Sequence, residues 1–180
     1  MRYLRQHAAL LGIDPNRLIA AGGSAGGHLA AAAAVLPDLN APTDDLSVST
    51  VPQALVLYNP VIDNGPEGYG YERVGERNKE FSPLHNLDKG SPPTIFFLGT
   101  ADKLIPVSTA QAYKKKIEEK GGRCDLYLYE GQPHGFFNYK KNDLANFKDT
   151  VLKTDAFLQS LGYLKGEPTL DQFLSSGYQP

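Results

Sequence analysis

Four short apolar runs recur along the chain, each about as long as a β-strand, at residues 17–21, 53–58, 94–98 and 125–129. Segments with helical spacing or helix-forming composition follow three of them, at 28–36, 106–120 and 144–161. The last segment places apolar residues along one face: Leu144, Phe147, Val151, Leu158 and Leu161. Strands that alternate with helices predict βαβ units. We therefore expect an α/β fold with a mainly parallel sheet of about four strands, flanked by helices.

The remaining segments complete a single expected domain over residues 1–180. Residues 2–11 predict an amphipathic helix with Leu4, Ala8 and Leu11 on one face, ended by Gly12. Residues 63–90 show no clear periodicity, which in a compact domain is typical of a functional loop or lid. Residues 165–180 form a polar tail that we expect to lie over the surface.

Composition excludes several function classes. The 180 residues include 18 Lys and Arg against 20 Asp and Glu, so the balance does not favour a nucleic-acid partner. No apolar run approaches the roughly 18 residues that a membrane span requires. Cys124 is the only cysteine, which excludes an internal disulfide and a multi-cysteine metal site. A signal peptide is not evident, so the default expectation is the cytoplasm, although the chain opens inside a helix and its location stays open.

The pattern Gly22-x-Ser24-x-Gly26 lies between an expected strand and an expected helix. This is the arrangement of a nucleophile elbow, a turn so tight that its neighbouring positions must lack side chains. The backbone N–H of Ala25, at the helix start, would then help to hold an oxyanion. The alternative is an ordinary glycine-rich turn. A nucleotide site is disfavoured because the glycines do not follow the G-x-G-x-x-G order.

A serine nucleophile needs a base and an acid from elsewhere in the fold. His134 follows the last expected strand and is the candidate base. Asp102 follows the third strand and is the candidate acid, which gives the chain order Ser, Asp, His. Asp63, just past the second strand, is the rival acid.

Four further residues beside the expected strand ends could shape a substrate pocket or could serve packing alone. They are Gly23, Tyr58, Asn59 and Pro60.

Three segments of the sequence resemble the catalytic blocks of α/β-hydrolase esterases. They are residues 22–30 (GGSAGGHLA), 99–107 (GTADKLIPV) and 131–136 (GQPHGF). The chain resembles acetylxylan-esterase-like and hormone-sensitive-lipase-like carboxylesterases, from Asp14 to about Gly162. Gly23 stands where the lipase branch usually has Asp, which favours the acetylxylan-esterase-like branch.

The resemblance implies a serine carboxylesterase that hydrolyses short-chain acyl esters through an acyl-enzyme, with acetyl esters on carbohydrate as one candidate substrate. It implies no metal and no organic cofactor. The alternatives are a weak or inactive hydrolase-like module used for assembly, or a peptidase or thioesterase with the same triad.

Enzymes of this kind carry early strands and an HGGG-type loop, which donates a second oxyanion N–H, before the elbow. This sequence has no such loop, and losing one oxyanion donor costs about 10²–10³ in rate. We therefore expect either a fragment or shortened relative with impaired activity, or a homodimer. In the homodimer, a second copy would cover the exposed apolar edge at Leu18–Ala21.

Overall fold

A four-stranded parallel sheet organises the first part of the chain. The computed structural model describes residues 1–36 and 39–176. The strands are β1 (Ile19–Gly23), β2 (Ala54–Tyr58), β3 (Thr94–Gly99) and β4 (Cys124–Tyr129), in the spatial order β1-β2-β3-β4. The predicted α/β fold and its four strands are confirmed, with β1 shifted by two residues toward the elbow.

Parallel pairing brings the carboxyl ends of all four strands to one edge of the sheet. Gly23 pairs with Tyr58, Tyr58 with Phe97, and Phe97 with Tyr127. The segments that follow the strands therefore meet there, at Ser24, Asn59, Thr100 and Glu130. This is the edge at which ligands bind in open α/β sheets.

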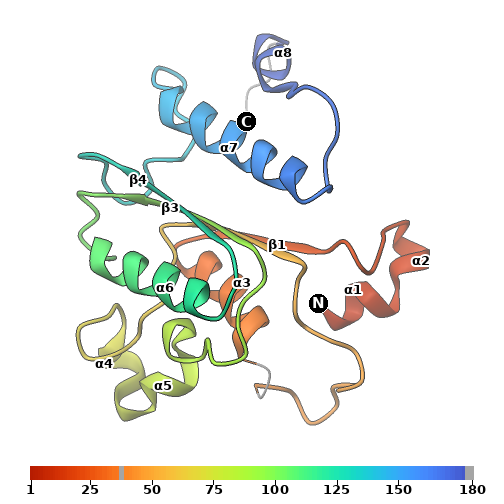
Figure 1. Ribbon diagram of the computed structural model, residues 1–180, viewed down its shortest axis with the longest axis vertical. Coiled ribbons are helices and arrows are strands. Elements are labelled where there is room, and N and C mark those ends of the chain that lie inside the picture. Colours follow the sequence, from red (N-terminus) through yellow and green to blue (C-terminus); the bar gives the residue numbers. More distant parts are fainter. Residues whose placement is uncertain (37–38, 177–180) are drawn as a thin grey trace. The chain divides into compact units, whose positions relative to one another are not determined.

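Two helices pack on this sheet (Figure 1). The alanine-rich α3 (Ala25–Val35) packs on β1 and β2, and α6 (Val107–Glu119) packs on β3 and β4. The residues that α6 buries, Ala110, Tyr113 and Ile117, are spaced by one helical turn. Side chains of both helices and of β2 and β3 form one core: Ala30, Ala31, Val35, Leu55, Leu57, Phe96, Leu98, Ala110, Tyr113 and Ile117.

The structure corrects the predicted helix boundaries. The first helix is broken at His7 into α1 (Arg2–Gln6) and α2 (Ala8–Leu11), and Leu4 and Leu11 of its predicted apolar face are exposed. Gly12 ends α2 in the left-handed conformation, as predicted. The helix predicted to begin at Pro106 begins at Val107, and Pro106 is its N-cap residue.

The segment predicted to be irregular contains short helical turns. They are α4 (Tyr71–Val74), η1 (Gly75–Arg77), α5 (Asn78–Phe81) and η2 (Pro83–His85). His28 of α3 holds this segment, because its Nε2 lies 2.8 Å from the Phe81 carbonyl oxygen. His28 therefore ties this segment to α3.

The chain divides into two compact units, Met1–Gly135 and Phe136–Pro180. The second contains α7 (Ala145–Ser160) and α8 (Leu170–Ser175), where Lys148 forms an ion pair with Asp171. The predicted polar tail thus carries a short helix, and its residues 177–180 lie outside the described residues. The prediction of a single domain stays a prediction.

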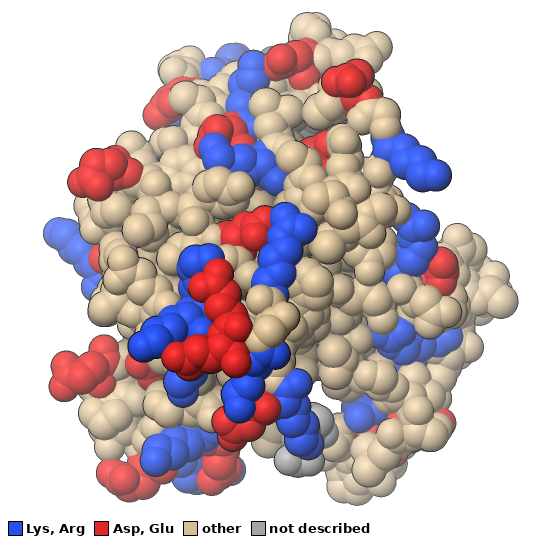
Figure 2. Space-filling view, viewed as in Figure 1, with Lys and Arg blue, Asp and Glu red and all other residues tan. Residues whose placement is uncertain are grey.

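Charged side chains of both signs are interspersed on the face shown in Figure 2. The basic run Lys114–Lys116 lies on α6, where Lys114 pairs with Glu118 and Lys115 with Glu119. Pairs at this spacing are typical of a solvated helix face. In the described part of the chain, no helix is long and apolar enough to cross a membrane.

Candidate active site

Ser24 stands in a sharp turn between β1 and α3. Its backbone has φ 53° and ψ −119°, a strained conformation for a residue with a side chain. The turn is held by the Ser24 N–H, which donates to the Tyr58 carbonyl oxygen at 2.9 Å. Glycine is required at position 22, since a Cβ there would lie 2.3 Å from the carbonyl carbon of Gly26. A Cβ on Gly26 itself would meet nothing within 4 Å, so the expectation that this position must lack a side chain is wrong. The elbow geometry inferred from the glycines is therefore present.

The loop after β4 brings His134 to the serine. The His134 Nε2 lies 3.0 Å from Ser24 Oγ, across 110 residues of sequence. This distance is within hydrogen-bond reach for a base and its nucleophile. The His134 side chain is 26% exposed, so the imidazole is partly open to a substrate.

Asp102 lies behind the imidazole, in the turn after β3. Its Oδ2 is 2.7 Å from His134 Nδ1, and its side chain is fully buried. The other oxygen, Oδ1, accepts the backbone N–H groups of Leu104 at 2.8 Å and Ile105 at 3.1 Å. A carboxylate only accepts, so Nδ1 carries the proton and Nε2 of the neutral ring presents a lone pair to Ser24.

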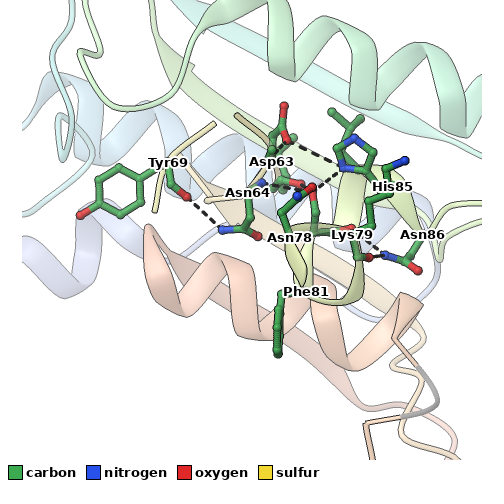
Figure 3. Close-up of polar contacts among 12 residues, drawn as sticks. Asp63, Asn64, Tyr69, Asn78, Lys79, Phe81, His85 and Asn86 are labelled. Atoms are coloured by element: carbon green, nitrogen blue, oxygen red, sulfur yellow. Dashed lines mark hydrogen bonds and ion pairs between the residues drawn. The ribbon is translucent and has the colours of Figure 1, made fainter. Parts of the chain in front are cut away.

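The rival acid Asp63 lies in a different network (Figure 3). Its Oδ1 accepts the Gly65 N–H at 2.8 Å and lies 3.8 Å from His85 Nδ1. His85 Nδ1 is in turn 2.8 Å from the hydroxyl of Ser82, which donates to the Ile62 carbonyl oxygen. Asp63 thus helps to fold the segment after β2, and Asp102 occupies the position behind His134.

Ala25 is the first residue of α3. The first N–H groups of a helix have no acceptor within the helix, and the helix dipole is positive there. This is the position that an oxyanion donor next to Ser24 requires. Among the described residues, no group of three or more His, Cys, Asp and Glu could hold a metal ion.

The four predicted pocket residues lie around the elbow. Gly23 and Tyr58 face each other in the β1–β2 ladder, and the Tyr58 ring stacks on Phe97 at 5.0 Å between centroids. Pro60 packs so closely on α3 that a Cβ on Gly27 would lie 2.6 Å from its Cβ. These contacts show that Gly23, Tyr58 and Pro60 take part in packing around the elbow. Their role in binding substrate stays a prediction.

The contact of Asn59 with the base could not be foreseen from the sequence. Its Nδ2 lies 3.2 Å from His134 Nε2, and its Oδ1 accepts the Gly135 N–H at 3.1 Å. Asn59 has φ 33°, one of two positive values among described non-glycine residues, the other being Ser24. Asparagine tolerates this conformation, and this was the only sequence signal available.

The chain is similar to known hydrolases along most of its length. The family model of the prolyl oligopeptidase family matches residues 1–159. Apo esterase 2 of Thermogutta terrifontis is 42% identical with a TM-score of 0.85, over 92% of this chain and 63% of that one. Its propionate-bound form is 41% identical with a TM-score of 0.84, over 93% of this chain and 64% of that one.

Curated relatives are more distant and much longer. The acetylxylan esterase of Xylanibacter ruminicola is 26% identical over 184 residues, 93% of this chain and 34% of that protein. The acylamino-acid-releasing enzyme of Arabidopsis thaliana is 27% identical over 151 residues, 71% of this chain and 18% of that protein. This chain therefore spans only part of its relatives' length. The resemblance of the three motifs to α/β-hydrolase esterases is confirmed, and the chain belongs to the prolyl oligopeptidase family of α/β-hydrolases.

Proposed function

We propose that this chain is a serine carboxylesterase that hydrolyses short-chain acyl esters through an acyl-enzyme. The observation that carries the proposal is the continuous chain of contacts from Asp102 Oδ2 through both nitrogens of His134 to Ser24 Oγ. A hydroxyl is a weak nucleophile until a base takes its proton, and this arrangement supplies the base and fixes its tautomer.

In the proposed reaction, Ser24 Oγ attacks the ester carbonyl carbon and its proton passes to His134 Nε2. The carbonyl oxygen becomes an oxyanion, which the Ala25 N–H helps to stabilise. The C–O bond to the alcohol then breaks, and the leaving oxygen takes the proton from Nε2. Water attacks the acyl-enzyme by the same steps, which releases the acid and restores Ser24. The buried Asp102 carboxylate stabilises the imidazolium at each stage.

The substrate class is supported by the similar proteins. Structures of Thermogutta terrifontis esterase 2 are described with propionate and with butyrate bound, and a more distant relative is an acetylxylan esterase. We therefore propose acyl groups of two to four carbons. Acetyl esters on carbohydrate are the natural candidate within this class.

The test is hydrolysis of p-nitrophenyl acetate and butyrate by wild type, Ser24→Ala and Ser47→Ala. Ser47 is a matched control because it lies in a loop and its hydroxyl donates to the exposed Asp45. We expect Ser47→Ala to retain wild-type turnover and Ser24→Ala to lose at least about 10³-fold in kcat. Equal rates in wild type and Ser24→Ala would overturn the esterase proposal and favour an inactive hydrolase-like module.

A peptidase is the second candidate. It is favoured by the family match and by the similarity to an acylamino-acid-releasing enzyme. The same variants assayed on an N-acetyl-alanine p-nitroanilide decide between the two. Ser24-dependent cleavage of the anilide at a rate comparable to the esters would favour the peptidase, and cleavage of esters alone would favour the esterase.

A further inference from the structure

Asn59 is held rigidly at the end of β2. Asn59 is only 1% exposed, and its backbone N–H donates to the Phe97 carbonyl oxygen at 2.7 Å. Its φ of 33° is unfavourable for most side chains, so the position is restricted to a few residue types. The Cα and Cβ atoms of Asn59 are therefore held in place beside the His134 loop, and with them the start of the side-chain amide.

The contacts define which end of the amide faces the imidazole. The Gly135 N–H donates at 3.1 Å, and only an oxygen can accept it, so Oδ1 points to Gly135. Nδ2 is then the atom 3.2 Å from His134 Nε2. Since Asp102 holds the proton on Nδ1, Ser24 Oγ and Asn59 Nδ2 share the single lone pair of Nε2 in a three-centre hydrogen bond.

We propose that Asn59 is a positioning residue that fixes the His134 ring and presents a donor, never an acceptor, to Nε2. The inference rests on the proposed function and deepens it. Once Nε2 has taken the serine proton, that proton finds no acceptor on Asn59. It is therefore directed to the leaving alcohol oxygen, as the first half of the reaction requires.

The same donor serves the second half of the reaction. In the acyl-enzyme, Ser24 Oγ is esterified and has no proton to donate to Nε2. The Asn59 Nδ2–H group still donates to Nε2, and the bond from Gly135 to Oδ1 still ties the loop to β2. The ring thus keeps its orientation while the deacylating water binds.

Two substitutions separate this role from packing. Asp and Gly both tolerate a positive φ, so Asn59→Asp and Asn59→Gly keep the backbone conformation. Aspartate also keeps the shape and the acceptor for Gly135 but turns a carboxylate oxygen toward Nε2. That oxygen accepts the imidazolium proton and competes with the leaving group. Glycine removes the amide without adding an acceptor.

We expect kcat for p-nitrophenyl acetate to fall about tenfold in Asn59→Gly, the effect of one lost hydrogen bond. It falls at least about 10²-fold in Asn59→Asp, because general acid–base catalysis is impaired. We expect KM to stay within about threefold in both, because a positioning role acts on the His134 ring and leaves the binding of substrate unchanged. A packing role predicts the opposite order, with the isosteric Asp variant the more active, and that order overturns the proposal.

Nitrogen-15 NMR of the histidine rings separates failure of this inference from failure of the esterase function. At pH 8 we expect His134 to be protonated on Nδ1 alone in wild type and on both nitrogens in Asn59→Asp. Identical His134 signals in the two proteins overturn the inference even if wild type is an active esterase. The expected signals in a wild type without turnover overturn the esterase function alone. If Asn59→Asp does not fold, wild-type kcat in Asn59→Gly overturns the inference.

Discussion

The glycine at the end of β3, Gly99, packs against the loop that carries the proposed base, His134. A Cβ on Gly99 would lie 2.1 Å from the carbonyl oxygen of Gln132 and 2.6 Å from its carbonyl carbon. Contacts under 3.0 Å essentially never occur for a real Cβ, so Gly99→Ala must separate the two segments by about 0.9 Å. The same Gln132 oxygen accepts the Ala101 N–H at 3.0 Å, which leaves little room for it to turn away.

The added methyl group would therefore push apart the two loops that carry Asp102 and His134. Gln132 precedes His134 by two residues, and Asp102 follows Gly99 by three. A misplacement of about 1 Å costs on the order of 10² in rate, so we expect kcat/KM to fall about 10²-fold. Overpacking adds about 1–3 kcal/mol of destabilisation.

The assay pairs ester turnover with thermal unfolding, and Gly26→Ala serves as the control for stability. A Cβ on Gly26 meets nothing within 4 Å, and Gly26 lies in α3. We expect this control to keep or raise stability, by up to about 1 kcal/mol. Wild-type turnover together with wild-type stability in Gly99→Ala would show that Gly99 does not set the spacing of the two segments.

Three further predictions concern other parts of the molecule. Asp102→Asn removes the acceptor that fixes the His134 tautomer, so kcat falls by about 10⁴ while the circular dichroism spectrum is unchanged; wild-type turnover would contradict the assigned role. Burial raises the pKa of the Cys124 thiol from 9.0 to about 12. Native protein at pH 8 should therefore not react with a disulfide reagent until urea unfolds it. Between these two pKa values the thiol has lost its proton in the unfolded chain but keeps it in the folded protein. The free energy of unfolding therefore falls as the pH rises from 9 to 12. Cys124→Ala should remove this contribution to the pH dependence of stability. Pairing of two copies along the edge at Leu18–Ala21 predicts twice the mass of 19.6 kDa in light scattering, and a monomer at every concentration excludes it.

The two central strands, β2 and β3, could be predicted because they are buried on both faces. All residues of β3 and the first four of β2 are buried, so they read as continuous apolar runs. The grouping of Ser24, Asp102 and His134 could be predicted because each follows a strand of a parallel sheet, where the strand ends meet.

The short helices could not be predicted, because their stability comes from contacts distant in sequence. α4 and α5 have four residues each, too few to show periodicity or to be stable alone. The segment is held from outside by His28, and internally by Asn78, whose Nδ2 donates to the Gly75 carbonyl oxygen. No local pattern encodes the contact with His28, which is 53 residues from Phe81.

The break at His7 could not be predicted either. The sequence pattern continues through this residue, but the backbone leaves the helix there and the His7 ring stacks on Tyr3. The role of Asn59 likewise depends on a backbone angle and on Gly135, 76 residues away.

The proposed reaction requires that His134 and Asp102 make Ser24 an activated nucleophile. Intact-mass measurement after incubation with a fluorophosphonate probe tests it most directly, because labelling needs an activated serine and no ester substrate. We expect one adduct per chain, located on Ser24, absent from Ser24→Ala and strongly slowed in His134→Ala. An unlabelled wild type, or equal labelling of wild type and His134→Ala, would contradict it.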